Sequence, residues 1–366
     1  PAGHLPRHGY RGVLSMNRYL LLAAVLPATM AGAMEPLSDA ELSDVQGAGL
    51  GFVLDQVLLD GSGAQIVIND ITDGQGRNVP ISVKNLYLGA AGSNKGTNLS
   101  PVTIGSLDHP FELELAKGEE LRTLRDDGQW VQTTPNNITV LSFKFPERLV
   151  AGGNPCIDGY AAAGSNCSTG SSGRADLGVR FDFQVAAGRT EMLALDFHQL
   201  VMDGSYLRLW GDPGQNGNGE LVGEARINLF AKTLEVMSCA QVNCNTAGET
   251  AAQRGARTLY ITNGYANIAL GYGKSQPLRL RSSADGQFVL ELQNPAASGT
   301  TAAQRQALAS DFYANAPRTN LVFENLTVGG TRSSPTAIPT GGYNFGRNEI
   351  SGLSFNYLKV TSYDLR

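Results

Sequence analysis

Short runs in which apolar and polar residues alternate constrain the fold of this 366-residue chain more than any other feature. In the run VRFDFQV, residues 179–185, every second residue is apolar, which is the period of an extended strand with two different faces. The runs LRLR (278–281) and LSFNY (353–357) alternate in the same way. Each run is therefore predicted to be a β-strand with one half-buried face.

Dipeptides typical of tight turns separate such runs. Asn263-Gly264 joins the two halves of LYITNGYANI, and this pair favours a type I′ hairpin turn, which needs positive φ at both central residues. Asp-Gly pairs recur at 60–61, 203–204 and 285–286. Glycine supplies 44 of the 366 residues, well above the ~7% of an average protein. Because tight turns join antiparallel neighbours, we expect antiparallel sheets.

These patterns predict an all-β fold, an antiparallel β-sandwich or stacked sheets with long loops and one or two short helices. A β-solenoid is the alternative, although the sequence shows no fixed repeat period. One helix is expected within 300–317, where Thr301 and Gln304 form a capping box and Leu308 and Phe312 lie one turn apart. The similar run TAAQR at 250–254 is followed by Gly255, which prevents a long helix there.

A long segment of small residues divides the β-rich body. It covers residues 149–175, between an N-terminal β region at 50–148 and a C-terminal β region at 176–366. The alternatives are two domains or one domain with a long insertion, because loops of this length in compact domains are usually functional or flexible.

The N-terminal part has the order of zones of a secretory signal peptide. Arg18 precedes an apolar run at 19–26, and the small triplet Ala31-Gly32-Ala33 fits a signal-peptidase site. We therefore expect residues 16–33 to be the signal peptide, with Met16 as the initiator and residues 1–15 as upstream read-through. The apolar run is much shorter than the ~20 residues that a membrane-spanning helix needs.

Removal of residues 1–33 takes away three arginines and no acidic residue, so the formal charge moves from −5 to 25 − 33 = −8. An acidic chain argues against binding to nucleic acid or to anionic lipid surfaces, because both reward clustered Lys and Arg. Partners are expected to be other surface or assembly proteins, including copies of the chain itself.

Residues 34–49 predict a short capped helix followed by a glycine linker. Ser38 and Glu41 form a capping box, and Gly47 is a suitable C-terminal stop. Two turns of helix are too short to be stable alone in water, so the helix is expected to dock on a partner. The apolar residues available for docking are Leu37, Leu42 and Val45.

The stretch LSDAELSDVQGAG (37–49) resembles a segment of the form L-S-D-x-E-L-S-x-V-x-G-Q that follows the signal peptide in a loose group of exported proteobacterial proteins. That resemblance implies a β-rich body and a role in a pilus system or at the cell surface. The stretch is also similar to double-glycine leaders, in which Leu37, Leu42 and Val45 would dock on a protease-transporter. Here it departs from the pattern, because Ala48 stands in place of the second glycine.

The four cysteines fall in two close pairs, Cys156 with Cys167 and Cys239 with Cys244. In an oxidising compartment such pairs predict local disulfides, although four cysteines allow three connectivities.

A catalytic site is not recognisable from sequence motifs, since the chain contains no H-E-x-x-H, no G-x-S-x-G and no phosphate loop ending in G-K-[ST]. Asp196 and His198 lie on one face of a predicted strand, where an acid could orient an imidazole, but a polar face exposed to water is the preferred interpretation. Glu112 and Glu114 likewise share one strand face, which we interpret as solvated rather than catalytic.

Calcium is the one cofactor for which the sequence offers oxygen donors. The loop DPGQNGNGE presents them at Asp212, Asn216, Asn218 and Glu220, and a looser candidate combines Asp70, Asp73 and Asn78. Neither matches a complete calcium loop, so hairpin loops without metal are the alternative.

Together these features predict an exported, non-enzymatic structural or adhesion protein at the bacterial cell surface or outside the cell, with the periplasm as a further location. It could be a component of a pilus-like assembly. The alternative is a secreted module that binds carbohydrate or lipid, or a hydrolase whose residues lie far apart in the sequence.

Overall fold

The computed structural model describes residues 49–69, 75–90, 100–107, 109–125, 129–146, 177–187, 189–202, 204–213, 219–239, 250–283, 286–334 and 337–361. The predicted signal peptide at 16–33, the docking residues Leu37, Leu42 and Val45, and the segment 149–175 lie outside the described residues.

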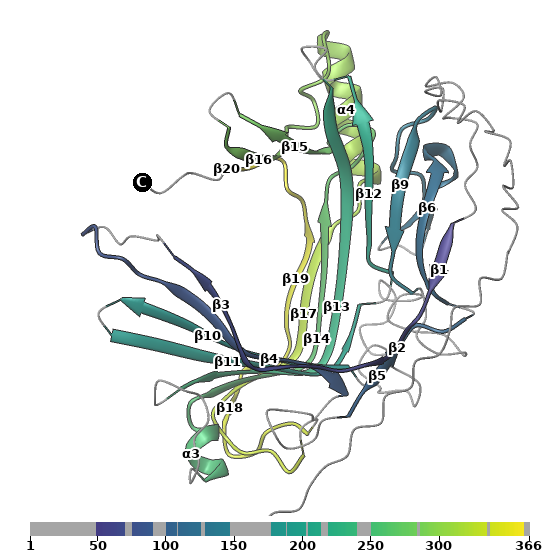
Figure 1. Ribbon diagram of the computed structural model, residues 1–366. Coiled ribbons are helices and arrows are strands. Elements are labelled where there is room, and N and C mark those ends of the chain that lie inside the picture. Colours follow the sequence, from purple (N-terminus) through teal and green to yellow (C-terminus); the bar gives the residue numbers. More distant parts are fainter. Residues whose placement is uncertain are drawn as a thin grey trace, which may run out of the picture.

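Strands dominate the described part of the chain (Figure 1). The N-terminal strands are β1 (Leu50–Phe52), β2 (Leu54–Val57), β3 (Leu59–Ile68), β4 (Ile81–Ala90), β5 (Val102–Ile104), β6 (Phe111–Lys117), β7 (Thr123–Leu124), β8 (Trp130–Val131) and β9 (Thr139–Lys144). They are followed by β10 (Leu177–Ala187), β11 (Arg189–Val201), β12 (Tyr206–Asp212), β13 (Glu220–Ser238), β14 (Thr258–Leu270), β15 (Leu278–Ser282), β16 (Phe288–Leu292), β17 (Thr319–Val328), β18 (Tyr343–Asn344), β19 (Asn348–Leu353) and β20 (Leu358–Thr361).

Three short helical elements complete the described structure: η1 (Gly118–Glu120), α3 (Ala251–Gly255) and α4 (Ala302–Asn315). In α4 the Thr301 hydroxyl accepts from the backbone N–H of Gln304, and the Gln304 side chain accepts in return, so the predicted capping box is present. In α3 the helix ends at Gly255, where a Cβ would lie 1.7 Å from the carbonyl oxygen of Gly330. Only glycine permits this approach.

One 16-stranded sheet contains most of these strands, and every described strand pair is antiparallel. The predicted all-β class with antiparallel strands and short helices is therefore confirmed. The neighbours run β1-β6-β9-β12-β13-β11-β10-β4-β3, while β14 and β15 pair with the other edge of β13. Because β6 and β9 share this sheet with β12, strands from 50–146 and from 177–361 belong to one sheet.

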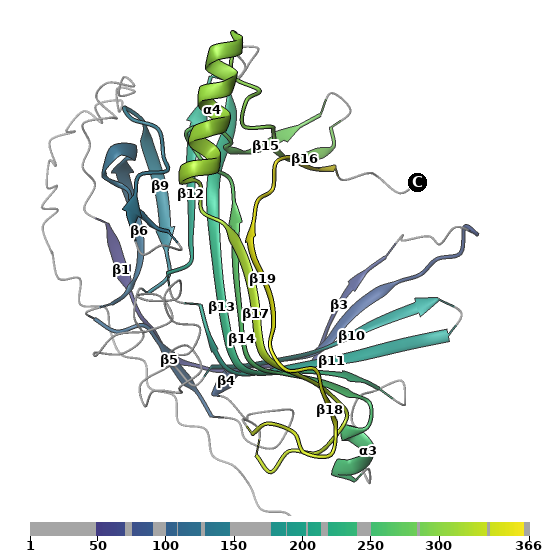
Figure 2. The same ribbon diagram turned by 180° about the vertical axis from the view of Figure 1, so that it is seen from behind.

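The centre of the sheet is β13, whose 19 residues pair first with β12 and then with β11. Beyond the middle of β13 the long strands turn through a sharp bend, as β13, β14 and β17 show in Figures 1 and 2. We call the part formed by β3, β4, β10, β11 and the paired ends of β13, β14 and β17 the lower arm. The part around β12, β9, β6, β15 and β16 is the upper arm.

Two residues with positive φ mark the bend, Gln199 in β11 and Asn263 in β14. On both sides of them the strands keep the same register, with His198 opposite Thr233 and Gly264 opposite Ala231. The side chains that face the buried side are even-numbered in β13 before the bend and odd-numbered after it. The burial pattern of β14 shows the same exchange at its left-handed residue Asn263, whereas β13 has no residue of positive φ.

This finding corrects two of the predicted turns. Asn263-Gly264 does not close a hairpin, because β14 runs through it, and Asp60-Gly61 lies inside β3. The positive φ that favours Asn before Gly in a type I′ turn is used here at Asn263 to bend a continuous strand. Gly286 does lie in the turn between the paired strands β15 and β16, as predicted.

Other predicted strands also differ in extent. LRLR lies within β15, but only the first residue of LSFNY belongs to β19, and residues 354–357 form the connection to β20. Gln276 explains this break, because its side-chain amide donates to the carbonyl oxygens of Phe355 and Asn356 and holds them away from a strand neighbour.

The bend gives a first testable prediction. Replacing Asn263 with Val should lower the free energy of unfolding by about 1–2 kcal/mol, because a β-branched residue is strained at positive φ. Asn263→Gly is the matched control and should stay within about 0.5 kcal/mol of the parent, since glycine adopts this conformation freely. Urea unfolding followed by circular dichroism measures both; equal stability of the Val and Gly variants would contradict the role given to Asn263.

Candidate functional site

The two faces of the lower arm differ sharply in chemistry. One row of opposed residues is polar and crosses seven strands: Tyr87, Arg180, Asp196, Glu235, Tyr260, Thr327 and Asn344. The adjacent row, one residue away along the strands, is apolar: Leu59, Leu88, Val179, Phe197, Leu234, Ile261 and Leu326. The sheet therefore has a polar face and an apolar face over its full width.

The polar face is the better buried of the two. Asp182, His198, Thr233 and Thr327 are buried, whereas Val179, Phe181, Phe183 and Val185 are only half-buried. The predicted alternation is confirmed, but the interpretation of Asp196 and His198 as a face exposed to water is wrong, because His198 is only 5% exposed. Arg332, from the segment after β17, covers part of this face, as the following contacts show.

Arg332 lies in the segment after β17 and contacts two residues of the polar row. Its guanidinium lies 4.5 Å from the centre of the Tyr260 ring and forms an ion pair with Glu235. Asp196 lies opposite Glu235 in the neighbouring strand and 3.5 Å from Nε2 of His198. Asp196 also lies 3.9 Å from the guanidinium of Arg180. We call Asp196, His198, Glu235, Tyr260 and Arg332 the lower cluster.

Charges within the lower cluster shift several pKa values. Burial opposes a charge on His198, but the Asp196 carboxylate and the charge of Glu235 outweigh it, so the pKa of His198 is raised. Burial raises the pKa of Glu235, with a further contribution from Asp196 and an opposing one from Arg332. Burial lowers the pKa of Arg332. Protonated His198 is therefore favoured by the folded state.

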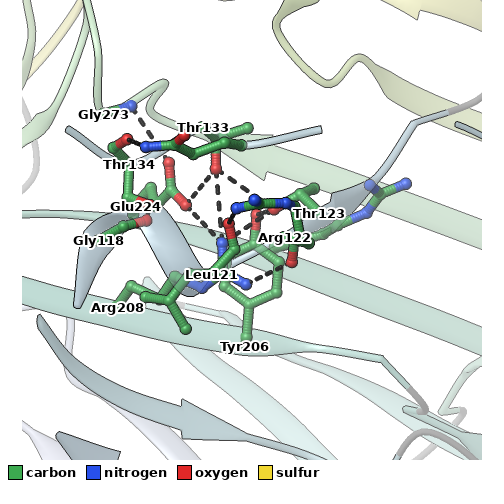
Figure 3. A network of polar contacts seen from close by, with 12 residues as sticks. Gly118, Leu121, Arg122, Thr123, Thr133, Thr134, Tyr206, Arg208, Glu224 and Gly273 are labelled. Carbon is green, nitrogen blue, oxygen red and sulfur yellow. Dashed lines mark hydrogen bonds and ion pairs between the residues drawn. The ribbon is translucent and has the colours of Figure 1, made fainter. Parts of the chain in front are cut away.

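A second buried network lies in the upper arm (Figure 3). Arg208 of β12 and Glu224 of β13 face each other at 2.9 Å, each with a side chain only 2% exposed. The remaining carboxylate oxygen, Oε2, accepts from the backbone N–H of Gly273 at 3.1 Å, and Oε1 also accepts from the Thr133 hydroxyl at 2.6 Å. The carboxylate is thus held from three directions.

Arg208 uses its remaining donors on the segment 121–134. It donates to the carbonyl oxygen of Arg122 at 2.6 Å and to the Thr123 hydroxyl at 2.9 Å, and it stacks 4.0 Å from the centre of the Tyr206 ring. Arg226, two residues beyond Glu224 in β13, donates to the carbonyl oxygen of Leu124. Figure 3 shows Arg208, Glu224, Arg122, Thr123 and Thr133 close together.

The upper network binds backbone through Arg208 and Arg226, whereas the contacts of the lower cluster join side chains to one another. A loop packed on a sheet brings N–H and C=O groups that need partners, and a buried arginine supplies several donors at once. Burial also raises the pKa of the Tyr206 hydroxyl within the upper network. The upper arrangement can hold the segment that contains Arg122 and Leu124 on the sheet.

Sequence reasoning did not single out Arg208, Glu224, Glu235 or Arg332. The available signal was one charged residue between apolar neighbours in YLRLW and in LVGEAR. Such a charge indicates a two-faced strand, but only the paired strand shows that the two charges meet.

Glu112 and Glu114 lie on one face of β6, as predicted. Lys144 in the neighbouring strand bridges them, with Nζ at 2.7 Å from Glu112 and 3.0 Å from Glu114. Burial opposes the charge on Lys144, but the two carboxylates prevail and raise its pKa. The pair is neutralised by a lysine across the strand.

Asp212 and Glu220, two of the predicted calcium ligands, lie opposite each other at the ends of β12 and β13. Both face Arg279, at 3.8 and 2.5 Å. Asn216 and Asn218 lie outside the described residues, as do Asp70 and Asp73 of the looser candidate, while Asn78 is described. Among described residues, no three His, Cys, Asp or Glu side chains form a metal-binding group. Calcium binding stays a prediction.

Cys239 lies at the end of β13 and packs beside Met192, Ala194 and Met237. Cys156, Cys167 and Cys244 lie outside the described residues, so the predicted disulfide pairing stays a prediction.

Part of the apolar face of the lower arm has no second layer among the described residues. Near the bend the small β2–β5 sheet covers this face, with Val57, Val102 and Ile104 packed on Leu177, Leu200 and Ala231. Farther from the bend lie two more apolar rows. The first is Phe181, Leu195, Val236, Leu259 and Val328, and the second is Ile66, Val83, Phe183 and Leu193. We call these nine residues the apolar patch.

Each residue of the apolar patch is half-buried or exposed, and each is aliphatic or phenyl. The upper arm continues the pattern with the row Leu50, Leu113, Phe143 and Leu207 and the row Leu221, Leu280, Leu290 and Val360. Monomeric soluble proteins rarely expose contiguous apolar areas of this extent, and such areas mark binding surfaces.

Comparison with protein-family models, with curated proteins and with solved structures finds no match to this chain. The described helices include none that is both long enough and apolar enough to span a membrane.

The upper network predicts a large effect of one neutralising substitution. Glu224→Gln leaves the Arg208 charge buried without its counter-ion, and the free energy of unfolding should fall by about 3–5 kcal/mol. Glu349→Gln is the matched control, because its partner Arg347 and Glu349 itself are both more than 40% exposed; it should cost less than about 1 kcal/mol. Denaturant unfolding decides, and similar losses in both variants would contradict a special role for Glu224.

The lower cluster predicts a dependence of stability on pH. Since the pKa of folded His198 is raised, its contribution is fully present below the ordinary histidine pKa and is lost as pH rises through the folded value. The free energy of unfolding should therefore fall as pH rises above about 6. His198→Gln should make this dependence on pH weaker. His109→Gln is the control that should retain the parent slope. Unfolding midpoints at several pH values test this, and an unchanged slope in His198→Gln would be the contrary result.

Proposed function

We propose that this protein is an exported, non-enzymatic component of the bacterial cell surface that works by binding other proteins through the apolar face of its sheet. The carrying observation is the apolar patch with its continuation in the upper arm, where rows of aliphatic and phenyl side chains lack a covering layer among the described residues. Burial of apolar area is the main favourable term in most protein association.

The polar networks support the same proposal. The buried ionisable groups are engaged in holding chain segments on the sheet, as Arg208 and Arg332 do, instead of facing an open site. A structural or adhesive role in a pilus-like assembly requires no reactive group beyond these contacts.

A lipid-binding module is the second candidate. The observation in its favour is that the apolar rows carry no polar side chain, which suits acyl chains that offer no hydrogen-bonding group. Proteins that bind through interfaces of ordinary composition make about one hydrogen bond per 100–200 Å².

Localisation tests the proposal. The chain is expressed from Met16, and cells and the sheared surface fraction are examined by immunogold electron microscopy. Gold at the cell surface, and along filaments if the assembly is pilus-like, is the expected result. Gold confined to the periplasm or free in the medium would overturn the surface assignment.

A variant that lacks residues 35–48 is examined in parallel, because this segment carries the predicted docking residues Leu37, Leu42 and Val45. Loss of surface display with the circular dichroism spectrum unchanged is expected. The parent chain with the three residues replaced by Ser serves as the matched control for deletion effects, and it should behave like the deletion.

A further inference from the structure

Strand β3 ends the 16-stranded sheet on one side, because it pairs with β4 alone among the described strands. Figures 1 and 2 show no described strand beyond it. We infer that this open edge accepts an extended segment of a partner protein, which adds to the sheet as a further strand beside residues 65–68. The inference rests on the proposed function, because it states how a protein partner binds to this sheet.

The backbone of residues 65–68 has one side available for pairing. The inner side pairs regularly with β4, where Gln65 lies opposite Lys84 and Ile68 opposite Ile81. Within the described part of the chain these residues form no other backbone hydrogen bond. Alternate residues of an antiparallel strand direct their N–H and C=O groups to the same side, so the outer side offers about four hydrogen bonds. The group that matches their spacing is the backbone of another extended chain.

The other terminal strands among those described have features that discourage strand addition. β1 and β18 have three and two residues, while β19 and β20 contain the charged residues Glu349 and Lys359. β3 has ten residues, and its one charged residue, Asp60, lies outside 65–68. Its register shift lies before Gln65. Short, charged or proline-containing edges resist pairing, and residues 65–68 include no charge and no proline.

Apolar side chains at this edge indicate which segment fits. Ile66 and Ile68 lie on the apolar face and are 57% and 53% exposed. Val83 and Phe183, which follow Ile66 inward along the same row, are half-buried. A strand added outside β3 with apolar residues at alternate positions covers the two isoleucines, because cross-strand neighbours on one face are in contact. The segment therefore alternates apolar and polar residues.

Charge distinguishes such a segment from a second copy of β3. Residues 59–76 contain three aspartates and no basic residue. Lys84, the basic residue opposite Gln65, itself lies opposite Asp182 in β10. Two copies of β3 in antiparallel contact would bring acidic flanks together, whereas Lys or Arg on both sides of an apolar segment is attracted to them. The occupant is therefore an extended segment of alternating apolar and polar residues with basic flanks.

The test uses the exported full-length chain and the synthetic peptide RTVTVTVR, blocked at one end and carrying an uncharged fluorophore at the other. Fluorescence anisotropy is recorded up to ~500 µM protein, and saturable binding is expected. The charge-reversed peptide ETVTVTVE should bind at least about 5-fold more weakly.

Two methylated forms of RTVTVTVR test whether backbone forms the contact. One carries N-methyl groups on its Val residues and the other on its Thr residues, so the side chains are the same. Only one of the two sets of N–H groups faces β3, because alternate residues of a strand point to the same side. One form should lose affinity by at least about 10-fold, and the other should stay within about 2-fold of the parent peptide.

A variant of the edge tests the site. Ile66→Lys places a charge where the added strand covers apolar surface and should weaken binding at least about 10-fold. Val360→Lys is the matched control, because Val360 is 51% exposed on the terminal strand β20; its affinity should stay within about 2-fold of the parent. Where Ile66→Lys does not give the parent circular dichroism spectrum, Ile68→Lys replaces it.

Several results would overturn the inference: no saturable binding, equal affinity for the two charge forms, equal affinity for the two methylated forms, or binding that Ile66→Lys and Ile68→Lys leave unchanged. Self-association of the parent in size-exclusion chromatography that Ile66→Lys abolishes would assign the edge to a second copy instead. A chain at the cell surface that does not bind the peptide would refute the inference and leave the proposed function standing. A chain that binds the peptide but is absent from the surface would do the reverse.

Discussion

The ion pair between Arg208 and Glu224 is the contact on which the cover of the sheet depends. Two charges buried at this depth are costly unless every remaining hydrogen-bonding position is used. Here Thr133, the N–H of Gly273 and the carbonyl oxygen of Arg122 take most of those positions, and Nε of Arg208 has no hydrogen-bond partner among the described residues. The pair therefore fixes irregular chain on the polar face of β12 and β13, and Arg332 with Glu235 repeats the arrangement in the lower arm.

The apolar face of the lower arm is only partly covered by the described residues. A sheet usually buries its apolar face under a second layer and leaves the polar face to water. In the upper arm the covered face carries both the Arg208–Glu224 pair and an apolar cluster in which Leu121 and Val140 pack with Trp210 and Val222. The small β2–β5 sheet covers the apolar side only near the bend.

Local sequence patterns predict many of the strands and helices of this fold. Alternation in VRFDFQV predicts β10, and Thr301 with Gln304 predicts the start of α4. Long-range pairing did not follow from the sequence, because the partner of a strand depends on register across the whole chain. Asn263 shows the limit most clearly: its preference for positive φ was recognised, but the same conformation serves a hairpin or a bend, and only the neighbouring strands decide. Similarly, alternation separates the two faces of a strand without showing which face is covered. The face of His198 was interpreted as exposed to water, but the structure buries it.

The length of β13 has a mechanical consequence. Its 19 residues are paired with β11, β12, β14 and β15, so hydrogen bonds flank both of its edges along most of its length. A tension applied along this strand is shared among all of these bonds in shear, and many must fail together before the strand slides. The edge strand β20 is short and has only four residues paired with β16. A tension applied to β20 can break these pairings one after another. The resistance of the molecule to pulling thus depends on which end of the chain bears the load.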